Sequence, residues 1–136
     1  MDSVVHFELP TDDRQRIAKF YTQAFGWRTK ELGEEHGHYV LASTAETDAQ
    51  GMLLRTGAIN GGIYQRSNER PAQYPTVVIG VDDLKASMKK ITEAGGKVLG
   101  EPVDIPGYGT YVSFNDTEGN RLSIIEPTAE KKKMSK

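Results

Sequence analysis

Cysteine is absent from this chain of 136 residues, and the chain has no long apolar run. Without cysteine there can be no disulfide framework, thiolate metal site or cysteine nucleophile, and nothing in the chain requires an oxidising compartment. The first residues lack the charged and apolar regions of a signal peptide, and no segment approaches the length of a membrane span. We therefore expect a cytoplasmic protein with no membrane partner.

A strong charge of one sign is also missing. The 17 Lys and Arg residues are balanced by 19 Asp and Glu residues, which leaves a net charge of -2. Such a chain provides no basic field for a nucleic-acid backbone, so a nucleic-acid partner is not expected. Its length and its 37% hydrophobic content fit a single domain over residues 1–136, in which the basic segment 128–136 is a flexible tail.

The motifs of covalent hydrolysis and nucleotide chemistry are lacking as well. No Ser-His-Asp order, phosphate-binding loop or closely spaced pair of catalytic acids occurs in the sequence. The residue pattern therefore names no catalytic residues.

The N-terminal segment alternates between apolar and polar residues, as a strand with one buried face does. Its apolar residues share one face and its polar residues share the other, namely Val5, Phe7 and Leu9 against His6 and Glu8. If the apolar face packs under a helix, His6 and Glu8 must point away from that helix. This pair is the first candidate for a binding site.

The remaining pattern predicts one order of elements twice. In module one, about 4–66, a helix capped by Asp13 and ending at Gly26 is followed by strands at 27–32, 38–43 and 58–65. In module two, about 75–127, a strand at 76–81 and a helix at 84–94 precede strands at 97–103, 110–114 and 121–126. An offset of 70 residues pairs Asp13 with Asp83 and Gly26 with Gly96, while matching the last strands sets Gly57 against Gly119. We therefore predict an internal duplication of a βαβββ unit.

Short motifs in a fixed order resemble the vicinal oxygen chelate superfamily of glyoxalases, bleomycin resistance proteins and dioxygenases. The resemblance implies an α+β, glyoxalase-like fold in which two βαβββ modules have curled mixed sheets enclosing a pocket. A ferredoxin-like α+β sandwich is the other candidate, but it leaves the three strands after each helix unexplained. One departure from the family pattern is Thr117, where proline is usual. The motifs are His6-Phe7-Glu8-Leu9-Pro10, Phe25-Gly26-Trp27, Ile59-Asn60-Gly61-Gly62, Val81-Asp82-Asp83-Leu84, Glu93-Ala94-Gly95-Gly96-Lys97 and Glu118-Gly119-Asn120.

The resemblance also implies four strand positions that hold a divalent metal in the family. Carried onto this chain, they are His6, Gly61, Thr76 and Ser123. Only His6 is a usual ligand, because glycine has no side chain and neutral hydroxyls are poor donors to such metals. We therefore expect no cofactor and no complete metal site. In the alternative, Glu8 joins His6 as a second ligand.

Further residues are candidates for the ligand-binding site, and for several of them a structural role is the alternative. The resemblance places Val78 with Thr76 and Ser123 in the pocket, and Tyr108 and Tyr111 on its covering loop, where rim packing is the alternative. Gly61 and Gly62 permit close approach of a ligand or a kink in the sheet. We interpret His36 and His38 as an exposed turn and Glu126 as a strand-end surface charge. The carboxylate of Glu8 should favour the imidazolium form of His6.

These observations predict a glyoxalase-like homodimer that binds a small organic ligand between its two sheets, without a complete inherited metal site. The alternative activity is a metal-dependent lyase, isomerase or dioxygenase that uses His6 and Glu8. A third possibility is a structural or regulatory dimer with a vestigial pocket.

Overall fold

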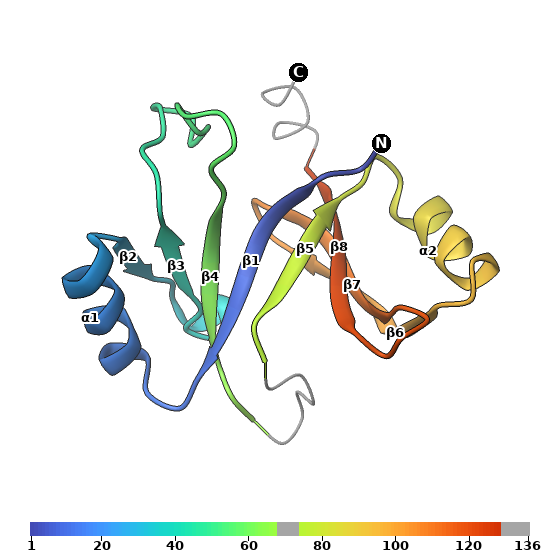
Figure 1. Ribbon diagram of the computed structural model, residues 1–136, viewed down its shortest axis with the longest axis horizontal. Coiled ribbons are helices and arrows are strands. Elements are labelled where there is room, and N and C mark those ends of the chain that lie inside the picture. Colours follow the sequence, from blue (N-terminus) through green and yellow to red (C-terminus); the bar gives the residue numbers. More distant parts are fainter. Residues whose placement is uncertain (68–73, 129–136) are drawn as a thin grey trace. The chain divides into compact units, whose positions relative to one another are not determined.

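A computed structural model describes residues 1–67 and 74–128 of the protein (Figure 1). Five elements in the order βαβββ are followed by five more in the same order, with one short 3-10 turn in the first set. The predicted element order is thus confirmed, including the three strands after each helix. The chain divides into two compact units, one of residues His6–Pro75 and one of Met1–Val5 with the residues from Thr76 onward. Within the described ranges, neither helix is long and apolar enough to cross a membrane.

The unit His6–Pro75 contains the first βαβββ set, except for the first two residues of β1. Its strands lie in the order β2-β3-β4-β1, with β1 and β4 parallel and the other neighbours antiparallel. The alternation of the N-terminal segment correctly predicted strand β1, which continues two residues beyond Leu9. The elements are β1 (Val4–Thr11), α1 (Arg14–Phe25), β2 (Arg28–Glu31), the 3-10 turn η1 (Glu34–His36), β3 (Val40–Ser43) and β4 (Asn60–Gln65).

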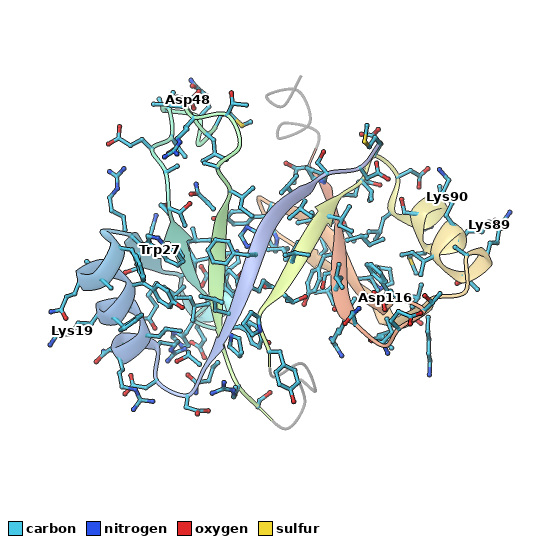
Figure 2. The ribbon with its side chains drawn as sticks, viewed as in Figure 1. Lys19, Trp27, Asp48, Lys89, Lys90 and Asp116 are labelled. Carbon is cyan, nitrogen blue, oxygen red and sulfur yellow. The ribbon has the colours of Figure 1, made fainter. Side chains whose placement is uncertain are left out.

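The core of this unit lies on the side of the sheet that carries α1. Its fully buried residues come from β3 and β4, and residues from β1 and α1 pack against them together with Trp27 (Figure 2), whose ring stacks on Tyr21 with centroids 4.4 Å apart. Phe7 and Leu9 belong to this cluster, as the alternation predicted, whereas Val5, the third apolar residue of that face, is 45% exposed and lies outside it. Because successive strand residues point to opposite faces, His6 and Glu8 lie on the other face. The cluster consists of Val40, Ala42 and Ile63 with Phe7, Leu9, Ile17 and Trp27.

The second unit contains the second βαβββ set. Its strands lie in the order β5-β8-β7-β6, with β5 and β8 parallel and the other neighbours antiparallel. Near the N-terminus, the carbonyl of Ser3 accepts a hydrogen bond from Gly80 N at 2.9 Å. The elements are β5 (Thr76–Gly80), α2 (Leu84–Glu93), β6 (Lys97–Ile105), β7 (Gly109–Asn115) and β8 (Arg121–Pro127). The core cluster is Val81, Leu84, Val112, Phe114 and Ile124.

The two helices begin in the same way. Asp13 accepts from the backbone N–H of Arg16, and Asp83 accepts from that of Ala86, both at 3.0 Å. Each aspartate satisfies one of the backbone donors that the first turn of a helix leaves unpaired. The predicted correspondence of Asp13 with Asp83 therefore reflects the same capping role.

A second repeated feature is an aspartate-centred turn in each unit, and the sequence pattern did not indicate it. In both turns the Oδ1 atom accepts from the backbone N–H groups two and four residues later, at 2.9 to 3.0 Å. The turns are centred on Asp48 and Asp116 (Figure 2), and a glycine with positive φ follows three residues later in each, φ 83° at Gly51 and 84° at Gly119. The turn geometry therefore matches Gly119 with Gly51 rather than with Gly57. The predicted flexible tail lies outside the described residues, except for Thr128, whose N–H donates to the carbonyl of Tyr108 at 3.1 Å.

Candidate functional site

Three polar side chains meet on the face of the first unit that points away from α1. His6 Nε2 lies 3.0 Å from the hydroxyl oxygen of Tyr39, and the Tyr39 hydroxyl donates to Glu8 Oε2 at 2.9 Å. The tyrosine oxygen therefore bridges the two residues that strand alternation placed on one face. We call His6, Tyr39 and Glu8 the polar triad.

The loop before β3 brings Tyr39 to this face. Gly37 and His38 both have left-handed backbone conformations, with φ 62° and 56°, and Tyr39 N donates to the carbonyl of His36 at 3.2 Å. Two consecutive left-handed residues form the tight turn that reverses a chain between antiparallel strands. Val40, the next residue, is 3% exposed in the core on the α1 side. Tyr39 precedes it and points to the opposite face, toward His6 and Glu8.

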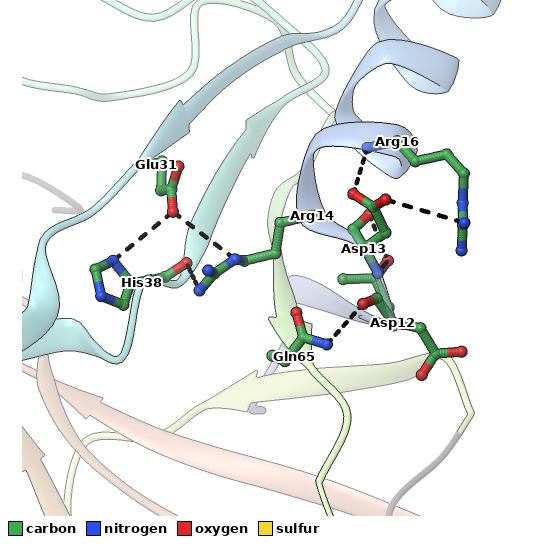
Figure 3. Close-up of polar contacts among 8 residues, drawn as sticks. Asp12, Asp13, Arg14, Arg16, Glu31, His38 and Gln65 are labelled. Carbon is green, nitrogen blue, oxygen red and sulfur yellow. Dashed lines mark hydrogen bonds and ion pairs between the residues drawn. The ribbon is translucent and has the colours of Figure 1, made fainter.

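The loop is tied to α1 by Arg14 (Figure 3). Arg14 Nη1 donates to the carbonyl of His38 at 3.3 Å, and its Nε lies 3.7 Å from Glu31 Oε1. The same carboxylate oxygen is 3.7 Å from His38 Nδ1. These contacts hold the backbone immediately before Tyr39, so they help to fix where its ring points.

Gly62 provides the room that the Tyr39 ring occupies. Gly62 is paired with Glu8 on β1 and with Leu41 on β3. A Cβ atom added at Gly62 would overlap the hydroxyl and the adjacent ring carbons of Tyr39. The polar triad therefore requires glycine at this position.

Gly61 lies on the opposite face, which differs from the expected ligand position. It pairs with Phe7, and a Cβ added at Gly61 would lie 2.5 Å from the Phe7 ring. The family-based placement put Gly61 on the face of His6, but the register of β1 and β4 sets His6 against Asn60 and Phe7 against Gly61. At both positions the small size of glycine leaves room for an aromatic ring of the protein itself. The sequence had suggested room for a ligand or a kink in the sheet instead.

The environment of His6 favours the neutral imidazole. Burial lowers the pKa of His6 from 6.5 to about 4, because the charged form loses solvation. This result contradicts the expectation that Glu8 would favour the imidazolium form. The physical reason is that the Tyr39 hydroxyl stands between the imidazole and the carboxylate, so His6 makes no direct contact with the negative charge.

The residues present do not fit the divalent metal of the family. The two strong donors, His6 and Glu8, are both hydrogen bonded to Tyr39. In the other unit, the Thr76 hydroxyl donates to the carbonyl of Arg121 at 2.7 Å, and the Ser123 hydroxyl is bonded to that of Ser113 at 3.0 Å. Among residues 1–67 and 74–128, no three His, Cys, Asp or Glu side chains form a group that could hold a metal ion. A tetrahedral or octahedral site needs more donors than the described residues bring together.

Four of the five candidates of the second unit, all except Tyr108, share one face of its sheet. Val78 pairs with Ser123 on the parallel strand, and Ser123 pairs with Ser113 on the antiparallel one. Thr76 and Tyr111 lie an even number of residues from Val78 and Ser113, so they point to the same side. Val78 and Ser123 are buried, and the hydroxyls of Thr76 and Ser123 are already paired within the unit. The structure thus brings these four residues onto one face.

Tyr108 lies in the turn between β6 and β7 rather than on a strand. Its N–H donates to the carbonyl of Ile105 at 3.0 Å. The ring is half-buried. Tyr108 and Tyr111 are therefore held by different elements, and only Tyr111 belongs to the sheet face just described.

Glu126 has a structural role that differs from the expected surface charge. Its Oε1 accepts from the backbone N–H of Leu84 at 2.9 Å, at the first position of α2. Together with Asp83 it satisfies backbone donors at the start of that helix. His36 and His38 lie in the predicted turn, where His38 is exposed as expected but His36 is half-buried. Each has a glutamate oxygen 3.6 to 3.7 Å from its Nδ1.

The polar triad includes one residue that the sequence did not single out. Tyr39 is 33 residues from His6 along the chain, and only the pairing of β3 with β4 and of β4 with β1 brings them together. One sequence signal was present, since Gly37 marks a turn immediately before an apolar strand. Register was the missing information, because a shift of one residue would turn Tyr39 to the other face.

Comparisons with known proteins agree with this architecture. The sequence profile of the Glyoxalase/Bleomycin resistance protein/Dioxygenase superfamily matches residues 3–124. A glyoxylase-like domain-containing protein of Didymella fabae is 31% identical over 118 residues, which cover 86% of this chain and 88% of that protein. A lactoylglutathione lyase of Haemophilus influenzae is 28% identical over 125 residues, covering 90% and 91%.

A similar fold occurs in a solved structure of low sequence identity. Methylmalonyl-CoA epimerase from Mycobacterium tuberculosis aligns with a TM-score of 0.68 at 13% identity, covering 96% of this chain and 91% of that one. The chain belongs to the Glyoxalase/Bleomycin resistance protein/Dioxygenase superfamily. Membership in this family implies that the protein binds a small molecule.

Proposed function

We propose that this protein binds a small organic ligand at the face that carries the polar triad, and that it does so without the divalent metal of the family. The observation that supports this proposal is the position of the Tyr39 hydroxyl, 3.0 Å from His6 Nε2 and 2.9 Å from Glu8 Oε2. Both strong donors of this face are engaged by the tyrosine. In this proposal a protein hydroxyl occupies the place that the family resemblance gives to an ion.

A ligand would bind the parts of this face that the protein leaves accessible. His6 and Glu8 are half-buried, as is Tyr39. Pockets for small organic molecules combine apolar walls with a few fixed polar groups, which is the composition of this region. The apolar contribution comes from Tyr39 itself and from Leu41, which lies beside Gly62 on β3.

The proposed absence of a tightly bound divalent metal is tested by elemental analysis of purified, dialysed protein. We expect well under one equivalent of zinc, nickel, manganese and iron, because two engaged donors hold a metal only weakly. Stoichiometric metal that disappears in the His6→Ala variant would overturn the metal-free proposal and favour the metal-dependent lyase, isomerase or dioxygenase.

The ligand arm uses ligand-detected and protein-detected NMR with a library of small organic fragments. We expect hits that perturb the signals of His6 and Tyr39 and that bind several-fold more weakly to His6→Ala. The substitution should leave the protein folded, since losing a half-buried polar side chain costs about 1 kcal/mol. Asp2→Ala, a change at an exposed residue near the N-terminus, is the control and should bind every hit as the wild type does. Equal binding by His6→Ala and wild type would reject the proposed site.

We also propose that the protein forms a homodimer, on the ground of its family. Phe20 and Phe25 on α1 are 56% and 67% exposed in the single chain, so apolar surface is available for an interface. Sedimentation equilibrium should give twice the mass of 15.0 kDa. A monomer at high micromolar concentration would contradict the dimer. The cytoplasmic location stays a prediction.

A further inference from the structure

The direction of the hydrogen bonds in the polar triad determines where the His6 proton resides. The Tyr39 hydroxyl has one hydrogen, and it donates that hydrogen to Glu8 Oε2 at 2.9 Å. Toward His6, at 3.0 Å, the same oxygen can therefore only accept. The imidazole must then donate through Nε2, so the neutral ring carries its hydrogen on Nε2 and presents a lone pair at Nδ1.

Nδ1 is the one polar atom of the His6 ring that this chain of hydrogen bonds leaves unused. No hydrogen bond to it occurs among residues 1–67 and 74–128. In the same part of the chain, every fully buried side-chain nitrogen and oxygen has a partner. Nδ1 is therefore not fully buried, which leaves it open to a hydrogen bond from outside the protein.

The charges of the triad restrict which molecule suits this atom. Glu8 contributes a carboxylate to the triad, and the imidazole is neutral, so the triad offers no positive charge to an anion. An unprotonated nitrogen accepts a hydrogen bond but cannot donate one. The complementary ligand group is consequently a hydroxyl or an N–H.

We propose that His6 binds its ligand through an unprotonated Nδ1, and that this face selects uncharged organic molecules that present a hydroxyl or N–H donor. Tyr39 and Glu8 are positioning residues, because they fix the tautomer without contacting the ligand at Nδ1. This inference rests on the proposed function and specifies its ligand class.

Long-range ¹H–¹⁵N NMR of the imidazole rings near pH 7 tests the tautomer without any ligand. In the wild type, His6 should be entirely in the Nε2–H form. Tyr39→Phe removes the acceptor and should give a mixture of the two tautomers. Glu8→Gln should also give a mixture, since an amide can either accept from or donate to the tyrosine and so permits the reverse direction. The signal of the exposed His38 in the same spectra serves as the internal control and should not change.

The ligand class is tested with matched pairs that differ only in the donor hydrogen. Phenol is compared with anisole, and benzyl alcohol with benzyl methyl ether, by the ¹⁵N shift of His6 Nδ1 on titration. We expect the hydroxyl compounds to shift Nδ1 and the ethers to bind at least fivefold more weakly. This ratio should fall toward one in Tyr39→Phe, in which Nδ1 is protonated in part of the molecules. A merely structural role for Tyr39 would leave the ratio unchanged.

The outcomes separate this inference from the proposed function. An Nδ1–H tautomer in the wild type, or ethers that bind as well as alcohols, would overturn the inference while His6-dependent binding of other fragments keeps the proposed function. Absence of any binding that depends on His6 would reject both.

Discussion

Gly62 and the Tyr39 hydroxyl share one space, because a Cβ atom at position 62 would overlap the tyrosine oxygen. The residue that leaves this room lies on β4, and the ring that fills it comes from the loop before β3. The geometry of the polar triad thus depends on a residue of β4 and a residue of the loop before β3, and not on His6 and Glu8 alone.

Gly62→Ala should displace the Tyr39 ring and lower the free energy of unfolding by about 1 to 3 kcal/mol, the range for overpacking a close contact. Tyr39→Ala creates space at the same point. In a double-mutant cycle measured by urea denaturation, the pair should therefore be non-additive, with Gly62→Ala nearly neutral in the Tyr39→Ala background. Additive effects would show that the alanine is accommodated without moving the ring.

The pH dependence of stability should carry a component from His6. The ordinary pKa of 6.5 falls to about 4 in the folded protein. Between these two values the unfolded chain binds a proton at His6 that the folded chain does not. The free energy of unfolding should therefore decrease as pH falls from 6.5 to 4, by at most about 1.4 kcal/mol per pH unit. Above pH 6.5 this stabilising contribution is fully present.

The measurement compares urea denaturation of the wild type and His6→Gln across pH 4 to 7.5. Glutamine does not titrate, and its amide can still donate to Tyr39, so the difference between the two curves isolates the histidine. A difference that grows steadily toward low pH within this window is expected. Parallel curves would show that His6 gains its proton equally well in both states.

Arg14→Ala should loosen the loop that carries Tyr39. The substitution removes the hydrogen bond to the His38 carbonyl and the contact with Glu31, at a cost of about 1 kcal/mol. The Tyr39 amide should also exchange its hydrogen faster. Arg16→Ala is the matched control on the same helix, because that side chain is 74% exposed and makes only a 3.9 Å ion pair with Asp13. Equal effects of the two substitutions would refute the role of Arg14.

Glu126→Ala should destabilise the start of α2. The backbone N–H of Leu84 would lose its acceptor, and loss of such a capping interaction typically costs about 1 kcal/mol. Glu126→Gln retains an acceptor oxygen and should recover most of the loss. Thermal unfolding and hydrogen exchange of the first turn provide the readouts, with the exposed Glu101→Ala as control. An unchanged midpoint of thermal unfolding in Glu126→Ala would indicate that Glu126 is only a surface charge.

The sequence predicted the helices and strands well, but it predicted less well which residues of different strands lie side by side. Alternation placed His6 and Glu8 together because it depends only on neighbours along one strand. Gly61 was assigned to the wrong face because the position of β4 against β1 is set by packing between strands, and a slip of one residue reverses every side chain. Glu126 was misjudged for a related reason, since its partner, Leu84, is 42 residues away.

Because a side chain at position 62 would overlap Tyr39, substitutions at these two positions can occur only in a certain order. A metal-binding side chain cannot appear at position 62 while the aromatic ring is in place, because the two would occupy the same volume. A variant that places a ligand there must first replace the tyrosine with a smaller residue, and that intermediate has lost the bridge between His6 and Glu8. Relatives with a bulky residue at the position of Gly62 should therefore have a small one at the position of Tyr39. Glycine at position 62 is compatible with the tyrosine bridge, whereas a metal-binding side chain at that position is not.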